Sequence, residues 1–170
     1  RIRRGSLLAL TGIRSRHFIP DGLQASDLAV SAARQALRSA GADATDVDLL
    51  VWGSASQDLV EPATAHIVAD KLGLDCPVFD VKNACNSFLN GLQVAIALLA
   101  TRSHRTALVV TGESPSRAIR WSVDSAASFA LSAPGYTMGD AGAAVLLTYD
   151  EDCEGVFFQE HRSWSRHWPI

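Results

Sequence analysis

Short apolar runs of strand character alternate along this chain with stretches of helical periodicity, and this alternation limits the possible folds more than any other feature. The apolar residues between 28 and 40 recur at helical spacing, with Ser26 or Asp27 as the N-cap and Gly41 at the end. Further helices are expected at 62 to about 73, at 86–100 and near 124–131, and strands at 48–52, 77–81, 106–112, 143–149 and 155–159. Such an order is typical of an α/β fold with a mixed, mostly parallel sheet covered by helices.

The helix expected at 86–100 is apolar on nearly all sides. A helix of that kind is normally surrounded by protein, so the sequence predicts that it is buried.

Composition places the chain among globular proteins and excludes several functions. Its 170 residues are 48% hydrophobic and carry a formal net charge of −3, which suits a packed core and argues against both disorder and a surface for nucleic acid. No apolar run reaches the roughly 18 residues of a membrane-spanning helix, and no secretory signal is recognisable. We therefore expect a protein of the cytoplasm that binds neither nucleic acid nor membrane.

Neither disulfides nor metals are expected. Cys76, Cys85 and Cys153 are an odd number at irregular spacing, which fits neither a disulfide framework nor a zinc site. His161 and His167 lie six residues apart, and no carboxylate or cysteine completes a set of metal ligands with them.

Cys85 stands where a strand ending near Val81 is followed by a helix. The unpaired N–H groups and the positive dipole end of a helix favour a thiolate over a thiol, and they can hold an oxyanion formed by attack on a carbonyl. One interpretation is therefore a covalent nucleophile. The other is a small buried hydrophobic residue, the usual role of a lone cysteine at such a turn. Cys76 and Cys153 have no comparable setting and are interpreted as packing or surface thiols.

Four motifs, in the same order and at similar spacing, resemble those of 3-oxoacyl-[acyl-carrier-protein] synthase III and its relatives in the thiolase-like superfamily. They are Thr-Gly-Ile-Arg-Ser-Arg at 11–16, Phe-Asp-Val-Lys-Asn-Ala-Cys-Asn-Ser-Phe at 79–88, Leu-Val-Val-Thr-Gly-Glu at 108–113 and Gly-Asp-Ala-Gly-Ala-Ala-Val-Leu at 139–146. The resemblance implies a subunit of two similar α/β halves in five layers, αβαβα. Residues 1–170 would form the N-terminal thiolase-like half-domain with the nucleophile. The C-terminal half, with the family's His and Asn, would not be in this chain.

The resemblance also implies a reaction. Cys85 would take an acyl group from an acyl-CoA or acyl-carrier-protein thioester, and a malonyl thioester would then lose CO2 and attack the acyl carbon. The thioesters would be substrates, with no permanently bound cofactor. The partners implied are coenzyme A thioesters or an acyl carrier protein, and a second copy of the chain in a homodimer.

Four further residues are candidates for substrate binding by the same resemblance. Phe88 would line the acyl pocket, or belong to the ordinary core. Arg14 would lie by the mouth of a coenzyme A channel, and Arg117 and Arg120 where the family has an arginine that holds the nucleotide. Guanidinium groups suit phosphates. The alternative for each is a solvated surface arginine.

The motif at 139–146 supplies a glycine-rich turn. The resemblance places Gly139 and Gly142 where backbone segments pack tightly near the nucleophile. Asp140 would satisfy local backbone N–H groups and take no part in the chemistry.

Other functions remain open at this point. An enzyme of the same kind can instead pass the acyl group to an alcohol or amine, making an ester or amide. The chain can also be a non-catalytic ketosynthase-like partner subunit, or an unrelated α/β binder of small molecules. Ser6 and Leu10 stand about where members that use acyl-CoA commonly have Trp and Arg, which favours a donor bound to a carrier protein. The acyl chain and the acceptor are not fixed by the sequence.

Overall fold

The computed structural model describes residues 5–151, 155 and 159–167. Its centre is a four-stranded sheet in the order β2-β1-β3-β4. The strands are β1 (Leu49–Gly53), β2 (Val78–Val81), β3 (Thr106–Glu113) and β4 (Ala141–Thr148). Strand β1 is parallel to both β2 and β3, whereas β4 is antiparallel to β3. The predicted α/β class and the mixed, mostly parallel sheet are confirmed, while the strand expected at 155–159 falls mostly outside the described residues.

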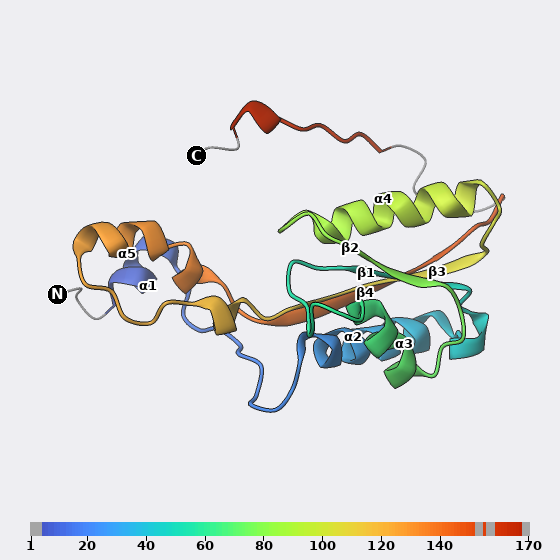
Figure 1. Cartoon of the computed structure of the whole chain (residues 1–170), viewed down its shortest axis with the longest axis horizontal. Helices are drawn as coiled ribbons and strands as arrows, with labels where there is room; N and C mark the ends of the chain where they lie inside the picture. Colours follow the sequence, from blue (N-terminus) through green and yellow to red (C-terminus); the bar gives the residue numbers. More distant parts are fainter. Residues whose placement is uncertain (1–4, 152–154, 156–158, 168–170) are drawn as a thin grey trace.

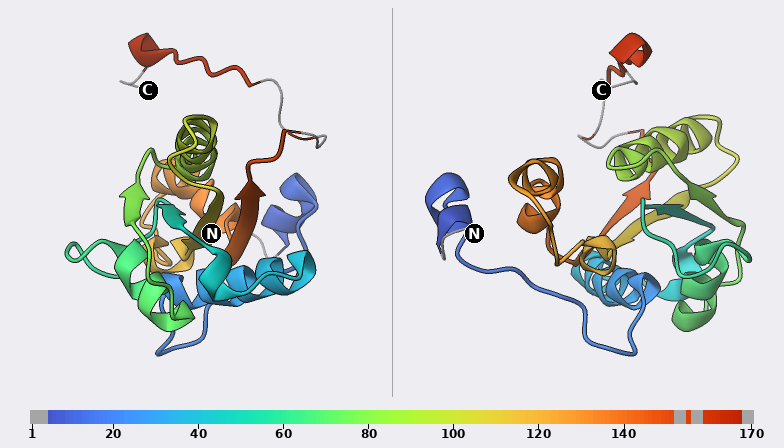
Figure 2. Two further views of the ribbon diagram at one scale, coloured as in Figure 1. Left: turned by 90° about the vertical axis from the view of Figure 1, so that its right-hand side faces the viewer. Right: turned by 60° about the vertical axis from the view of Figure 1, so that its left-hand side comes forward.

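Helices cover both faces of this sheet (Figure 1). Helix α4 (Ser87–Ala100) lies on one face, and helices α2 (Ala25–Ala40) and α3 (Thr64–Leu72) lie together on the other. The end-on view in Figure 2 shows the same three layers. This layering follows from the parallel strands, because a chain that re-enters a sheet in the same direction needs a crossover, usually a helix.

The two ends of helix α2 are set by a capping residue at its start and by a glycine at its end. Gln24, and not Ser26 or Asp27, is the N-cap, and the carboxylate of Asp27 accepts a hydrogen bond from the Gln24 N–H at 2.7 Å. The predicted N-cap was therefore wrong by two or three residues, because Asp27 acts from the third helical position in a capping box. Gly41 ends the helix in the left-handed region, with φ of 65°, as predicted.

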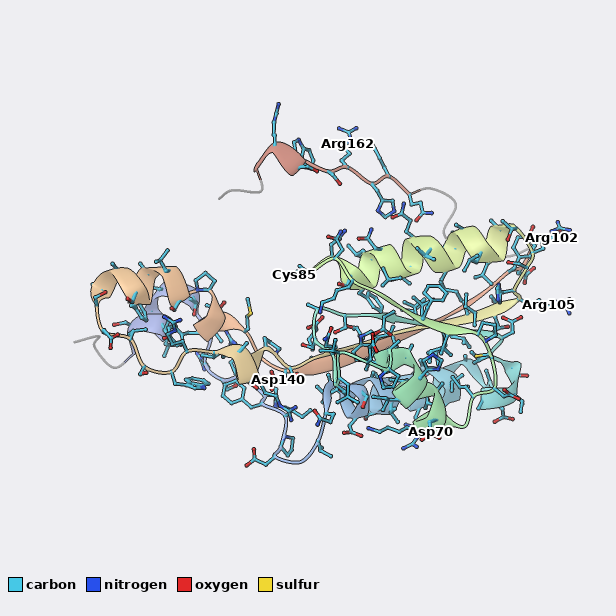
Figure 3. The ribbon with its side chains drawn as sticks, viewed as in Figure 1. Asp70, Cys85, Arg102, Arg105, Asp140 and Arg162 are labelled. Carbon is cyan, nitrogen blue, oxygen red and sulfur yellow. The ribbon has the colours of Figure 1, made fainter. Side chains whose placement is uncertain are left out.

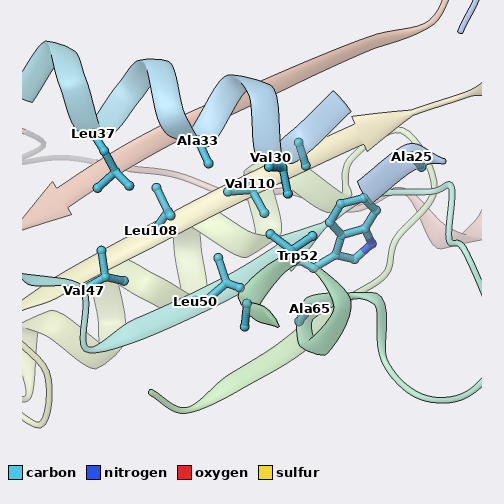
Figure 4. Packing of buried hydrophobic residues seen from close by; sticks show 13 residues of the cluster. Ala25, Val30, Ala33, Leu37, Val47, Leu50, Trp52, Ala65, Leu108 and Val110 are labelled. Carbon is cyan, nitrogen blue, oxygen red and sulfur yellow. The ribbon is translucent and has the colours of Figure 1, made fainter. Parts of the chain in front are cut away.

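The core consists of two apolar clusters, one on each side of the sheet. All five residues of β1 are buried. Trp52 belongs to the cluster between the sheet and helices α2 and α3, where Figure 4 shows it near Val30 and Ala65. Alternate residues of the same strand, Leu49 and Val51, face the smaller cluster under α4. Both faces of β1 are thus in contact with apolar side chains, as a central strand requires.

Helix α4 is less buried than its sequence predicts. Its buried residues form one line at four-residue spacing: Ser87, Gly91, Ala95 and Leu99. Leu89, which lies off that line, is 55% exposed. The prediction of a helix buried on nearly all sides was wrong for this chain, because only one side of α4 contacts the sheet.

A small lobe lies beside the sheet in Figure 1. It contains α1 (Ser6–Thr11), the short 3-10 helices η2 (Pro115–Ala118) and η3 (Gly135–Thr137), and α5 (Ala126–Ser132), which falls about where a helix was expected at 124–131. Edge-to-face packing of Phe18 on Trp121, with ring centroids 5.7 Å apart, joins its two chain segments. Two further 3-10 helices are η1 (Ala44–Asp46), before β1, and η4 (Ser165–His167), in the C-terminal segment.

Candidate active site

The strand directions bring the sequence motifs to one edge of the sheet. The carboxyl ends of β1, β2 and β3 meet there, because these strands are parallel. Since β4 is antiparallel, with Ala141 opposite Glu113, its amino end reaches the same edge. Figure 3 shows Cys85 and Asp140 at the end of the sheet that is next to the lobe, and Arg102 and Arg105 at its other end. The edge that holds Cys85 is therefore the candidate active site.

Cys85 lies in the turn between β2 and α4 and is exposed. Asn86 is the N-cap of α4 but makes no side-chain capping hydrogen bond. The amino end of the helix, with its N–H groups and positive dipole, therefore faces the turn that carries the thiol. The exposure excludes the role of a buried hydrophobic residue for Cys85 in this chain.

Side chains that the sequence did not single out hold this turn. Ser87 is buried, and its hydroxyl accepts a hydrogen bond from the Asn83 N–H and donates one to the Ala84 carbonyl. The side-chain oxygen of Asn90 accepts hydrogen bonds from the amides of Asn83 and Asn86. A serine in the first turn of a helix is a frequent local hydrogen-bonding residue, which is the signal that could have pointed to Ser87.

Glu113 organises the neighbouring loop. Its carboxylate, at the end of β3, accepts hydrogen bonds from the Ala55 and Ser56 N–H groups at 2.7 and 3.1 Å and from the hydroxyls of Ser54 and Ser56. One step further along the loop, the side-chain oxygen of Gln57 accepts a hydrogen bond from the Lys82 ammonium at 2.6 Å. The end of β1 is thereby tied to β3 and to the segment that leads to Cys85.

Phe88 is placed in the core. It is half-buried and packs against the cluster that includes Val51, Ala95 and Val109. Its backbone is close to β1, since a Cβ atom added to Gly53 would lie 2.9 Å from the Phe88 Cα. Of the two expectations for this residue, the packing supports the core role.

Asp140 is a buried carboxylate that fixes three chain segments. It accepts hydrogen bonds from the Ile19 N–H at 2.8 Å, from the Ser116 N–H at 3.0 Å and from the Ser116 hydroxyl. Burial alone would raise the pKa of Asp140, but the hydrogen bonds from Ser116 and Ile19 and the charge of Arg117 hold it below its ordinary value. These contacts support the structural role expected for Asp140.

The glycines of the turn at 139–142 do make close backbone approaches. A Cβ atom on Gly142 would overlap the carbonyl oxygen of Leu28 in α2, and one on Gly139 would lie 3.0 Å from the side chain of Arg16. Tight packing is thus present at both glycines, and for Gly142 the neighbouring backbone is that of α2, on the sheet face opposite α4.

The candidate arginines lie in different places. Arg117 donates hydrogen bonds to the Gln24 side chain at 2.7 Å and to the Leu23 carbonyl, so its guanidinium links the lobe to the start of α2. Arg14 and Arg120 are exposed. Their segments approach each other through η3, because the Arg16 side chain donates to the Thr137 carbonyl and the Tyr136 hydroxyl donates to the Arg120 carbonyl.

A hollow of about 480 Å3 lies between α4 and the C-terminal segment 159–163. Its lining includes the apolar Leu89, Leu92 and Ile96 and the polar Asn83, Asn86 and Asn90. In the part of the chain that the structure describes, no three His, Cys, Asp or Glu side chains are grouped as metal ligands. Within the same residues, no helix is long and apolar enough to cross a membrane.

Comparison with known sequences identifies relatives. The family model for 3-oxoacyl-[acyl-carrier-protein (ACP)] synthase III matches residues 79–163. A beta-ketoacyl-[acyl-carrier-protein] synthase III of Xanthomonas campestris pv. campestris is 36% identical over 143 residues, which are 84% of this chain and 42% of the relative. One of Neisseria meningitidis is 40% identical over 117 residues, 68% of this chain and 37% of the relative. The chain thus spans less than half the length of these curated relatives.

Solved structures give the same result for the fold. OleA of Xanthomonas campestris with bound cerulenin matches at a TM-score of 0.78 and 34% identity, over 86% of this chain and 47% of that chain. The acetamide-bound form matches at a TM-score of 0.77 and 34% identity, over 84% and 46%. These neighbours have the thiolase-like fold, which confirms the fold predicted from the four motifs.

Proposed function

Because the chain belongs to the 3-oxoacyl-[acyl-carrier-protein] synthase III family, we propose that it transfers an acyl group through a thioester on Cys85 and then condenses it with a malonyl unit. The observation that carries the proposal is the exposed Cys85 at the amino end of α4, inside the matched residues 79–163. Family membership supports enzymatic acyl transfer or condensation in general. The particular reaction is our proposal.

The first step is acylation of the thiol. The Cys85 thiolate attacks the carbonyl of an acyl thioester, so that a bond from Sγ to the acyl carbon forms and the bond to the donor sulfur breaks. The donor leaves as a thiolate and takes up a proton. N–H groups at the amino end of α4 can hold the oxyanion of the tetrahedral intermediate.

The second step forms the carbon–carbon bond. A malonyl thioester loses CO2, and the resulting carbanion attacks the acyl carbon on Cys85, whose sulfur then leaves as the thiolate. Groups that support decarboxylation are expected in the C-terminal half, outside residues 1–170. The pathway proposed is fatty acid or specialised metabolite biosynthesis.

We propose coenzyme A or carrier-protein thioesters as donors, and no resident cofactor. The names of the relatives support the carrier protein as a partner. For the phosphates of such donors, Arg14 and Arg120 are better candidates than Arg117, because the guanidinium of Arg117 already bonds to residues 23 and 24. A homodimer and a cytoplasmic location complete the proposal.

Mass spectrometry of the intact protein tests the acylation step. After incubation with acyl-CoA and acyl-carrier-protein donors, the native chain is expected to gain the mass of one acyl group, located on Cys85 by peptide mapping. The Cys85→Ala variant should gain none, whereas Cys76→Ala, which removes a half-buried thiol, should be acylated like the native chain. If no donor leaves an adduct on Cys85 of the complete polypeptide, the proposal fails.

A further inference from the structure

Cys85 is carried by a turn with an unfavourable backbone conformation. Ala84, directly before it, has φ of 46°, in the left-handed region that residues with a Cβ atom rarely adopt. Such a conformation persists only where the surroundings hold it, and it is frequent at functional sites. Two side chains of helix α4, Ser87 and Asn90, hold Ala84 in this left-handed conformation.

Ser87 holds the turn from its inner side. The residue is 1% exposed, and its hydroxyl accepts a hydrogen bond from the Asn83 N–H at 2.8 Å and donates one to the Ala84 carbonyl at 2.6 Å. The two hydrogen bonds bracket Ala84 along the backbone. One hydroxyl therefore bridges the Asn83 N–H, one residue before the left-handed residue, and the carbonyl of that residue itself.

Asn90 holds the turn from its outer side. Its side-chain oxygen accepts hydrogen bonds from the Asn83 amide at 2.7 Å and the Asn86 amide at 3.1 Å, and these two residues flank Ala84 and Cys85. Its own amide donates to the Gln93 side chain at 3.1 Å, which keeps it on the helix surface. Two side chains of the helix thus hold the turn, together with backbone hydrogen bonds from the Asn86 N–H to the Asn83 carbonyl and from the Ser87 N–H to the Ala84 carbonyl.

Strand β1 blocks movement of this helix start toward the sheet. A Cβ atom on Gly53 would lie 2.9 Å from the Ser87 carbonyl oxygen and 2.9 Å from the Phe88 Cα, so backbone lies against backbone there. The sheet blocks the turn on one side, and the hydrogen bonds of Ser87 and Asn90 fix its backbone. Cys85 is therefore kept on the exposed side of the turn.

We propose that Ser87 is a positioning residue for Cys85, with Asn90 as its second support. The inference rests on the proposed function, because the orientation of the thiol matters for acyl transfer only if Cys85 is the nucleophile. Without the Ser87 hydroxyl, the Asn83 N–H loses its partner, while the Ala84 carbonyl keeps the backbone hydrogen bond from the residue 87 N–H at 3.1 Å. The turn then relaxes away from the left-handed conformation. The thiol then faces the donor, and the helix N–H groups face the thiolate, for a smaller fraction of the time.

The test measures the acylation of Cys85 in the complete polypeptide, using acetyl-, butyryl- and octanoyl-CoA and the corresponding carrier-protein thioesters. Ser87→Ala is expected to lower the saturating rate about fivefold, the effect of losing roughly one hydrogen bond, and to leave the half-saturating donor concentration unchanged. The control is Ser26→Ala, because Ser26 is equally buried but bonds to Lys71 on the opposite face of the sheet. Its rate should equal that of the native chain.

A second measurement separates this inference from the proposed function. The rate of alkylation of Cys85 by iodoacetamide, followed against pH, needs no acyl donor, and Ser87→Ala should slow it about fivefold at neutral pH. If no donor acylates the native chain, the proposed function fails. The alkylation rates alone then test whether Ser87 positions Cys85. Native rates in Ser87→Ala, or an equal loss in Ser26→Ala, would overturn the positioning role. Should Ser87→Ala not fold, Asn90→Ala, at a half-buried site, is expected to slow both reactions in its place.

Discussion

Two cysteines of the described chain have very different surroundings. Cys85 is exposed, whereas Cys76 is half-buried and packs against the cluster under α2 and α3. Burial raises the pKa of the Cys76 thiol, and the nearby carboxylates of Asp48 and Asp75 raise it further, against one hydrogen bond from the Leu50 N–H. Because only the thiolate reacts with alkylating agents, Cys76 should be slow.

Competition between the thiols tests this difference. At about pH 7.5, iodoacetamide should label Cys85 several-fold faster than Cys76, as measured by peptide mapping over time. In denaturant, where both thiols are solvated, the two rates should become similar. Faster labelling of Cys76 in the folded protein would contradict the burial described above.

Asp140 gives a pH-dependent contribution to stability. Its pKa in the folded chain is below the ordinary value of 3.8, so the contribution is complete above that pH and is lost as the pH falls through the lower folded value. Asp140→Asn should lower the free energy of unfolding by about 1–3 kcal/mol at pH 7, since it weakens hydrogen bonds to a charged acceptor.

Denaturant titrations at pH 7 and near pH 3 measure this effect. The gap between the native chain and Asp140→Asn should narrow at the lower pH. Asp124→Asn, at an exposed position in the lobe, is the control and should change little at either pH. A gap that stays constant or grows on acidification would refute the assigned role.

At the residue scale, the sequence predicted the place of Cys85 but not what holds it. A cysteine between a strand and an apolar helix is visible in the order of residues. The hydrogen bonds of Ser87 and Asn90 are not, because they depend on the left-handed conformation of Ala84. The motif at 139–146 pointed to Asp140 through the family resemblance, while its partners Ile19 and Ser116 are distant in sequence.

At the scale of elements, small residues decide how closely α2 approaches the sheet. Cβ atoms on Gly112 in β3 and Gly142 in β4 would overlap the carbonyl oxygens of Ala25 and Leu28, respectively, both in α2. The helix therefore lies directly on the backbone of two neighbouring strands. A side chain at either glycine would force α2 outward.

Substitution of one of these glycines tests the contact. Gly142→Ala should lower the free energy of unfolding by about 1–3 kcal/mol, the usual cost of overpacking, in a denaturant titration. Gly135→Ala, where an added Cβ has nothing within 4 Å, should stay within about 0.5 kcal/mol of the native chain. Equal effects of the two substitutions would show that α2 can move away freely.

The bounds of helices and strands were predicted well where a local sequence pattern marks them. Features without such a pattern were predicted poorly. The strands at β1, β2 and β3 and the start of α4 lie within about two residues of their predicted bounds. Helix α1 was not expected, since its six residues are too few for a periodic pattern. The burial of α4 was overestimated, because apolar content alone does not tell which surfaces are present to cover it.

At the scale of the whole molecule, the sheet region and the lobe differ in burial. Every residue of β1 is buried, whereas α1 and α5 contain no buried residue. Hydrogen exchange of residues 1–170 should therefore be slowest in β1 and β3 and much faster in α1 and α5. Mass spectrometry of peptic peptides measures the difference, and equal protection in the two regions would contradict it.

Because β4 is antiparallel to its neighbour, all the motifs meet at one edge of the sheet, and the connections at the opposite edge carry none of them. Those connections are 41–48, 73–77 and 101–105, which precede the parallel strands β1, β2 and β3. Figure 3 shows Arg102 and Arg105 at the end of the molecule away from Cys85. The far edge is thus the natural place for a fluorescent label or an immobilisation tag. A label introduced at exposed position 103 through a reactive group other than a thiol would leave Cys85 free to react while the protein is fixed to a surface.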